Sequence, residues 1–169
     1  WKMFESDWYV WMDSSIRPLD GIDLADEIIK QAGEKPLCLF LHSKGNTVRE
    51  EARRTMQMLS QGNKYFTCRY SGEPIKEQII HYYGDPDFVD NKLFSTNFFA
   101  YHRSISDVMQ RWFDEVIQWS LQCQISLPYV LNKTGVEYSL FEGYTNIKNK
   151  YFIWDWRQRE RSLFNPQRF

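Results

Sequence analysis

The sequence predicts an α/β fold, with helices layered on both faces of a mostly parallel or mixed sheet (α/β/α). Residues 37–41 form a continuous apolar run of strand length without any charge, which is typical of a strand buried on both faces. On either side of this run, residues 24–32 and 48–60 carry apolar side chains at helical spacing. More strand-like and helical segments follow, so the two types alternate along the chain. This alternation is typical of a layered α/β domain.

The first part of the chain contains a strand and a helix separated by a turn. Residues 8–13 are compatible with a buried strand, and the helix at 24–32 is expected to stop at Gly33. Residues 17–21 are expected to form a turn or loop, because Pro18 excludes a central strand there.

The helix at 48–60 is the next element after the buried strand. Asn46 or Thr47 can cap it, and Gly62 follows its end. Its buried side is expected to hold Ala52, Met56 and Leu59. The later elements are expected at 74–83 (helix), 93–103 (strand), 107–121 (helix), 122–131 (helix interrupted around Pro128) and 136–141 (strand). The basic and aromatic residues from 146 on are expected to wrap around the domain.

The helix at 107–121 has the clearest periodicity in the chain, and Ser104 or Ser106 can cap it. Its apolar stripe is expected to consist of Val108, Met109, Trp112, Phe113, Val116, Ile117 and Ser120. Asp114 and Glu115 lie off this stripe, where a solvated helix face is the ordinary interpretation.

The composition excludes several classes of protein. The chain has 169 residues, a net charge of -1 and 25% charged residues, so it fits one domain and has no basic field for nucleic acid. Its 3 cysteines show no CxxC spacing, which argues against zinc or a disulfide framework and fits a reducing compartment. No apolar run approaches the roughly 18 residues of a membrane span. We therefore expect a cytoplasmic protein, or one bound peripherally on the cytoplasmic side of a membrane, unless a targeting segment has been removed.

Residues able to do chemistry follow three of the predicted strands. Asp13 ends the first strand, His42 ends the second, and His102 and Arg103 end the third. Ligands of open α/β sheets collect outside the carboxyl ends of strands, so these side chains are expected to converge at one edge. The alternative is that Asp13 merely begins a turn, and that each histidine is exposed or hydrogen-bonded in an ordinary way.

Asp13 is also a candidate metal ligand. A carboxylate followed by Ser14 and Ser15 can hold Mg²⁺ or Mn²⁺ and leave positions open for diphosphate oxygens. Alternatively, positive charge for the same diphosphate can come from basic side chains. The candidates for that role are Lys44, Arg49 and Arg103.

Several well-known catalytic motifs do not occur in the sequence. There is no GxGxxG or GxxxxGK[ST] phosphate-binding loop, and no GxSxG, HExxH or EF-hand pattern. These absences argue against a kinase, a P-loop nucleotidase, a zinc protease and a serine hydrolase. The aromatic content of 17% suits a cleft for sugars or bases, although aromatic residues are first of all core material.

Four segments resemble one known family in the same order along the chain. YVWMD at 9–13 is similar to the W-I-D-G strand end of that family, and HSKGNTVREEA at 42–52 to its R-H…V-x-E-E-A segment. NFFAYHR at 97–103 is similar to a strand that ends near a histidine. WFDEV at 112–116, followed by QCQISL at 122–127, is similar to W-F-x-E-V…R-D-Q-I-S-F. The family is the TOD/MUCI-type glycosyltransferase-like domain of plants and bacteria, long catalogued as a domain of unknown function.

The likeness covers roughly residues 8–131 and departs from the family pattern at two places. Ser14 replaces the usual Gly after Asp13, and Gln122-Cys123 stands where the family commonly has Arg-Asp. The family pattern also implies a nucleotide-binding βαβ half ahead of the first strand. The resemblance therefore predicts that 1–169 is a single GT-A-like domain lacking that N-terminal part, or a fragment of a larger chain.

The resemblance implies a glycosyltransferase-like domain that transfers a sugar from a nucleotide-sugar donor to a glycan or other hydroxyl acceptor. The residues it suggests as catalytic are Asp13, His102, Glu115 and Gln124, with Asp13 also holding a divalent metal, Mn²⁺ or Mg²⁺. Those suggested for substrate binding are His42, Lys44, Arg49, Arg103 and Trp11. The alternative is a non-catalytic carbohydrate-binding or assembly module derived from such a domain.

Overall fold

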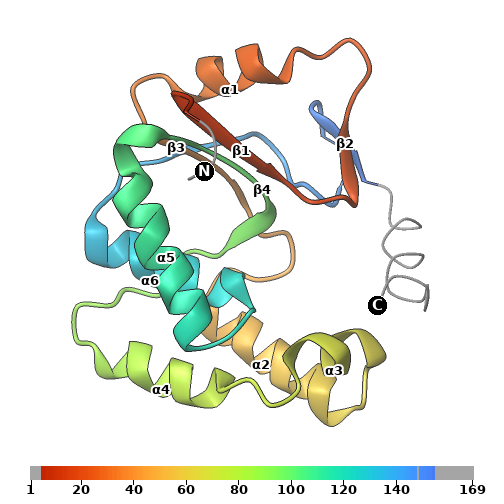
Figure 1. The fold of residues 1–169 in the computed structure, drawn as a ribbon. Helices are drawn as coiled ribbons and strands as arrows, with labels where there is room; N and C mark the ends of the chain where they lie inside the picture. Colours follow the sequence, from red (N-terminus) through yellow and green to blue (C-terminus); the bar gives the residue numbers. More distant parts are fainter. Residues whose placement is uncertain (1–4, 148, 155–169) are drawn as a thin grey trace. The chain divides into compact units, whose positions relative to one another are not determined.

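The computed structural model describes residues 5–147 and 149–154, which fold into two compact units (Figure 1). Of the described residues, the sheet unit comprises 5–43, 95–102, 138–147 and 149–154, and the helical unit comprises 44–94 and 103–137. The sheet unit contains β1 (Trp8–Met12), β2 (Ile16–Pro18), α1 (Leu24–Ala32), β3 (Leu37–Leu41), most of β4 (Phe94–His102), β5 (Ser139–Leu140) and β6 (Phe152–Trp154). The helical unit contains α2 (Val48–Ser60), α3 (Lys64–Tyr70), α4 (Ile75–Gly84), the 3₁₀ turn η1 (Arg103–Ile105), α5 (Ser106–Gln118) and α6 (Cys123–Thr134).

The main sheet has four strands in the order β1-β4-β3-β5. β1 and β4 are antiparallel, with Trp8 opposite His102 and Met12 opposite Phe98, whereas β3 and β5 are parallel. The α/β class with a mixed sheet is therefore confirmed. The sheet is mixed because the β1–β4 pair is antiparallel and the β3–β5 pair is parallel.

β3 also runs opposite to β4. The backbone N–H of His102 donates to the carbonyl of Pro36 (2.8 Å), so the end of β4 lies beside the beginning of β3. Further along, the Phe40 and Phe98 ring centroids lie 6.0 Å apart. β1 and β3 therefore run in the same direction on the two sides of β4, and their carboxyl ends lie at the same edge of the sheet.

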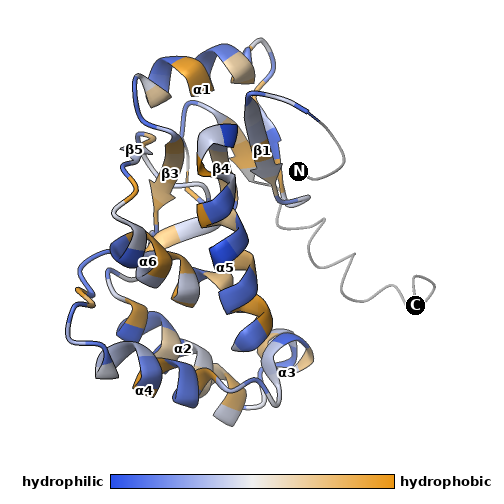
Figure 2. Cartoon of the chain, turned by 60° about the vertical axis from the view of Figure 1, so that its left-hand side comes forward, coloured by the Kyte–Doolittle hydropathy of each residue, from blue (hydrophilic) through white to orange (hydrophobic). Residues whose placement is uncertain are grey.

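The core of the sheet unit is built around Phe40. This fully buried ring contacts the rings of Phe98, Phe141, Tyr151 and Phe152. Helix α1 adds Ile28 and Ala32 to the same cluster. Figure 2 shows apolar and polar residues alternating along α1, as expected of an amphipathic helix that buries one side.

Helix α2 buries Ala52, as predicted, and Leu59 packs partly buried against the same core cluster. Its buried residues are Val48, Glu51, Ala52 and Thr55, which follow the i, i+3, i+4, i+7 spacing of one helical stripe. Met56, predicted to be buried, is 38% exposed. The prediction was wrong for Met56 because it followed only apolar residues, and the buried stripe includes an acid and a hydroxyl.

The apolar stripe of α5 is narrower than predicted. Val108, Met109 and Trp112 are buried, but Phe113 and Ile117 are 56% and 67% exposed. The predicted serine caps are also absent: Ile105 occupies the N-cap position without a side-chain cap bond, because a 3₁₀ turn precedes the helix. The helix at 24–32 and the strand at 37–41 are confirmed with the predicted bounds.

Helix α3 and strands β2 and β6 were not predicted, and α6 was predicted to be interrupted. Helix α3 was missed, and α6 continues through Pro128. Strand β2 contains Pro18 and pairs with β6 in a separate two-stranded sheet. A proline is tolerated there because each strand of such a pair has a free edge.

Candidate functional site

Two of the predicted site residues share one edge of the main sheet. Asp13 follows β1, and its backbone N–H donates to the carbonyl of Asn97 on β4 (2.8 Å). His42 follows β3, on the other side of β4, at the same edge. With neighbouring strands about 4.8 Å apart, the two backbones are separated by about 10 Å. Asp13 and His42 therefore follow two strands at the same edge of the sheet, on either side of β4.

This edge also holds two buried polar atoms without a hydrogen-bond partner among the described residues. They are Oδ1 of Asn97, on the strand between Asp13 and His42, and Oγ of Ser43, which follows His42. A buried oxygen without a partner is uncommon, because leaving it unsatisfied costs about 1–3 kcal/mol. Each of the two oxygens therefore keeps a capacity to accept a hydrogen bond that no described group uses.

His102 lies at the opposite edge of the sheet, so the predicted convergence of all three strand ends was wrong. It ends β4, but β4 runs opposite to β1 and β3, and His102 faces Trp8 at the beginning of β1. The rings of Trp8 and His102 contact each other edge to face, with centroids 5.5 Å apart. The prediction assumed parallel strands, whose carboxyl ends would coincide.

The basic candidates belong to the helical unit. Arg49 places its guanidinium over the Tyr83 ring, 4.1 Å from the centroid. Asp90 accepts hydrogen bonds from the backbone N–H groups of Val48 (2.7 Å) and Arg49 (3.1 Å). The side chain of Thr47 accepts the N–H of Glu50 (3.1 Å). The beginning of α2, a natural anion site, is thus already occupied by a carboxylate of the chain itself.

Lys44 and Arg103 are exposed; Arg103 directly follows His102, and Lys44 lies two positions after His42. Arg103 begins η1, and its carbonyl accepts a hydrogen bond from the Ser106 hydroxyl (2.8 Å). Gln124 is half-buried in the first turn of α6. The roles suggested for these three side chains stay predictions.

Glu115 takes part in a buried chain of hydrogen bonds in the helical unit. The hydroxyl of Tyr82, a fully buried residue of α4, donates to Oε2 of Glu115 (2.7 Å). Gln78 donates to the Tyr82 hydroxyl (3.0 Å) and accepts from Ser120 (2.7 Å). Burial, and after it the Glu115 carboxylate, raises the pKa of Tyr82 and keeps this hydroxyl protonated. Glu115 therefore links α5 to α4.

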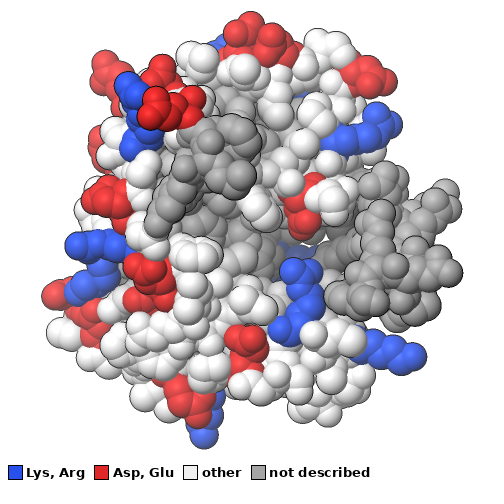
Figure 3. Space-filling model, viewed as in Figure 1, with Lys and Arg blue, Asp and Glu red and all other residues white. Residues whose placement is uncertain are grey.

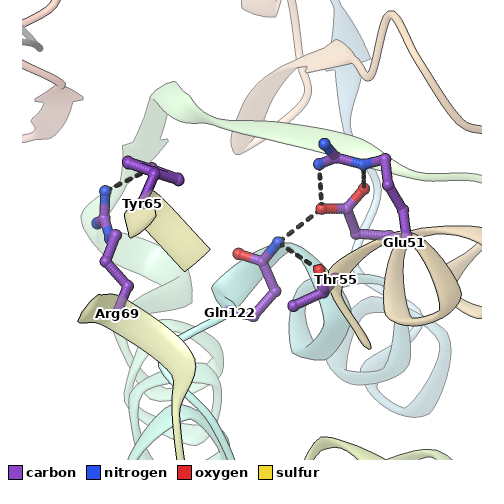
Figure 4. A network of polar contacts seen from close by, with 6 residues as sticks. Glu51, Thr55, Tyr65, Arg69 and Gln122 are labelled. Atoms are coloured by element: carbon purple, nitrogen blue, oxygen red, sulfur yellow. Dashed lines mark hydrogen bonds and ion pairs between the residues drawn. The ribbon is translucent and has the colours of Figure 1, made fainter. Parts of the chain in front are cut away.

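A second network joins α2 to the beginning of α6 (Figure 4). Glu51 is 1% exposed and accepts two hydrogen bonds from Arg54, of 2.9 and 2.6 Å. Gln122 also donates to the same carboxylate (2.6 Å) and lies 3.4 Å from the Thr55 hydroxyl. Gln122 is one of the residues that depart from the family pattern, and the structure gives it a packing role beside Gln124.

Two segments that carry the resemblance are in contact within the helical unit. Trp112 is buried, and its indole N–H donates to the Ser126 hydroxyl (3.0 Å) and the Cys123 carbonyl (3.2 Å). These two hydrogen bonds therefore fix α5 against the first turn of α6.

The described residues do not complete a metal site. Among residues 5–147 and 149–154, no group of three or more His, Cys, Asp and Glu side chains is placed to hold an ion. Asp13 is exposed and supplies a single carboxylate, flanked by Ser14 and Ser15. Its role as a metal ligand stays a prediction.

The described residues on the face seen in Figure 3 form no field of one sign. On the face seen in Figure 3, acidic and basic side chains are interspersed, in keeping with a net charge of -1. Within the described part of the chain, no helix has the length and apolarity that a membrane span requires.

The chain matches no family model, no curated protein and no solved structure. The assignment of a function therefore depends on the geometry of the sites described above.

Sequence reasoning missed Asn97, Ser43, Glu51, Gln122 and Tyr82. The available signal for Asn97 was its place directly before the apolar residues 98–101 of the predicted strand. For Glu51, the signal was its i+3 spacing from Val48. Gln122 and Tyr82 depend on contacts between distant segments, which no local pattern reveals. Ser43 became a candidate only when its buried hydroxyl was seen to have no partner.

Alkaline pH is expected to destabilise the helical unit. Burial, together with hydrogen bonds to Asp90 and Asp85, raises the pKa values of Tyr83 and Tyr129 from 10.0 to about 12. Between these pH values the unfolded state loses protons that the folded state keeps, so stability is complete below pH 10 and falls up to about pH 12. Urea unfolding at a series of pH values measures this fall. Tyr129→Phe should make the dependence shallower, and a constant free energy of unfolding over this range would contradict the prediction.

Proposed function

We propose that this chain is a glycosyltransferase-like domain that transfers a sugar from a nucleotide-sugar donor to a hydroxyl acceptor, with a glycan as the acceptor class. The observation that carries the proposal is the shared sheet edge of Asp13 and His42. An acid and an imidazole from two strands lie there beside the unpartnered oxygens of Asn97 and Ser43. Catalysis in such a site rests on positioning and on stabilising the charge of the leaving diphosphate.

The chain's own residues have distinct roles in this proposal. His42 lies at the edge of the sheet, and its imidazole donates a hydrogen bond to a ligand hydroxyl or accepts one from it. Lys44 follows it by two positions and supplies positive charge for the leaving group. Within the helical unit, Glu115 is held by Tyr82, and Gln124 lies in the first turn of α6; the role proposed for both is hydrogen bonding to hydroxyl groups of the acceptor. A divalent metal, when bound at Asp13, would neutralise part of the diphosphate charge.

The second candidate function is a non-catalytic carbohydrate-binding module. The observation that favours it is Trp11, whose side chain is 57% exposed on the edge strand β1, two residues before Asp13. An exposed indole next to an acid can bind a sugar without any nucleotide. This function needs neither a metal nor a leaving group.

Thermal-shift assays with a panel of nucleotide-sugars, with and without Mn²⁺, distinguish the two functions. For the transferase, we expect a stabilising shift with a preferred nucleotide-sugar, and its loss in Asp13→Ala. Asp20→Ala is the matched control, since Asp20 is an exposed acid of the same unit with a side chain 98% exposed. The control should bind the donor like the wild type.

Donor hydrolysis, followed by release of the nucleoside diphosphate, gives the second measurement. Asp13→Ala is expected to slow it at least about tenfold, since hydrogen bonds to charged groups contribute about 1.5–3 kcal/mol. The absence of any nucleotide-dependent shift or hydrolysis in the wild type would sink the transferase proposal. Glycan binding without a nucleotide effect would favour the module.

A further inference from the structure

A row of stacked aromatic rings lies on one face of the β1–β4 pair. The rings of Trp11 and Phe99 are 6.4 Å apart at 15°, those of Phe99 and Tyr101 6.5 Å at 28°, and those of Tyr9 and Tyr101 5.2 Å at 21°. Phe99 and Tyr101 are 8% and 4% exposed, whereas Trp11 is 57% exposed. The row therefore fixes the orientation of the indole and leaves much of it open to solvent.

Asp13 and Asn97 lie at the end of this row. The β1–β4 ladder pairs Trp11 with Phe99, and the bond from the Asp13 N–H to the Asn97 carbonyl continues it by one pair. Because side chains alternate along a strand, Asp13 belongs to the face of Trp11, and Asn97 to the face of Phe99. Diagonal neighbours in such a pair are about 7–8 Å apart. The indole, the carboxylate and the amide thus surround one small area.

From this arrangement we infer that Trp11, Asp13 and Asn97 form a subsite for one neutral sugar ring. The apolar C–H face of the ring lies on the indole, since the negative face of an aromatic ring attracts C–H groups. The carboxylate of Asp13 accepts hydrogen bonds from ring hydroxyls, and the amide of Asn97, whose oxygen has no partner, accepts another. This inference rests on the proposed function and names the part of the substrate that the edge binds.

The charge of the three residues favours a sugar over a diphosphate or a nucleotide at this position. None of the three is basic, and Asp13 is an acid, so without a bound cation an anionic group placed against them is repelled. A hydroxyl-rich ring has no charge and offers several donors to a carboxylate. An exposed aromatic ring with a few fixed polar groups is also the usual composition of a small-molecule site.

Saturation-transfer NMR with methyl hexosides, methyl pentosides and UDP- and GDP-sugars tests the inference. For a sugar that binds the wild type, Trp11→Ala is expected to weaken binding about tenfold or more, and Trp11→Phe to retain most of it. Asp13→Asn should reduce affinity without abolishing it, because an amide still accepts hydrogen bonds. The sugar protons of a nucleotide-sugar should receive more saturation than its base protons.

Met12→Ala is the matched control. Met12 is 40% exposed and belongs to the same strand, but it follows Trp11 and lies on the other face. The control should leave sugar binding unchanged. Far-UV circular dichroism of each variant ensures that a loss of binding is not a loss of the fold.

The possible results separate this inference from the proposed function. Nucleotide-sugar binding that is unchanged by Trp11→Ala overturns the sugar subsite and leaves the transferase proposal standing. Binding of methyl glycosides that depends on Trp11, without any effect of a nucleotide, supports the subsite and overturns the transferase. If neither methyl glycosides nor nucleotide-sugars bind the wild type, both are overturned.

Discussion

Glu51→Ala is expected to lower the free energy of unfolding by about 3 kcal/mol, because it removes the acceptor at the centre of a buried network. Arg54 and Gln122 both donate to this carboxylate, and Gln122 is 5% exposed. Breaking a buried pair costs about 3–5 kcal/mol, and the lower value applies because the Arg54 side chain, 33% exposed, can turn to solvent. Urea unfolding measures the change. Faster hydrogen exchange should appear in α2 and at the beginning of α6.

The matched control for this variant is Glu77→Ala. Glu77 is an exposed acid in the first turn of α4 in the same unit, so its removal should cost less than about 1 kcal/mol. Gln122→Leu provides a second test, since it leaves Glu51 paired with Arg54 alone and should cost less than Glu51→Ala. Equal stability of the wild type and Glu51→Ala would show that the network does not hold α6 to α2.

Phe40→Ala is expected to destabilise the sheet unit by about 3–5 kcal/mol, as large-to-small changes of a buried aromatic do. Phe40 is fully buried and its ring contacts four others, the nearest being Phe141, with centroids 4.8 Å apart. The lost ring leaves a cavity between the two sides of the core, and rigid aromatic neighbours cannot collapse into it. Chemical denaturation gives the magnitude, and hydrogen exchange in β3 and β4 gives the location.

Phe40→Leu is the volume-conserving control and should cost less than half as much, because most of the space stays filled. The same pair of variants tests whether β3 positions His42, the residue that directly follows Leu41 at the end of the strand. The Phe40→Leu variant should retain any ligand binding at the sheet edge that holds Asp13 and His42. A Phe40→Ala variant as stable as Phe40→Leu would contradict a close-packed core.

Local patterns were sufficient for the helices and strands with strong periodicity. The helix at 24–32, the strand at 37–41 and the helix at 48–60 are confirmed with their predicted bounds. Helix α3 was missed because its seven residues are too few to establish a periodicity. Strands β2 and β6 depend on each other for pairing, and neither has a pattern of its own.

The site was predicted in part. The sequence correctly suggested that Asp13 and His42 follow strands, and these residues do share an edge. His102 was placed at the wrong edge, because strand direction depends on where the chain re-enters the sheet. Asn97 became a candidate only when its position between β1 and β3 was known.

The sequence by itself determined the α/β class and the identity of the strands that end on polar residues, because alternation and periodicity are properties of neighbouring residues. The tertiary structure decided which of those strand ends meet, since the antiparallel pairing of β1 and β4 separates Asp13 from His102. It also decided that the acidic residue Glu51 is buried, because Arg54 and Gln122 donate hydrogen bonds to its carboxylate. Burial of a charge depends on partners brought together by folding, and no local pattern contains them.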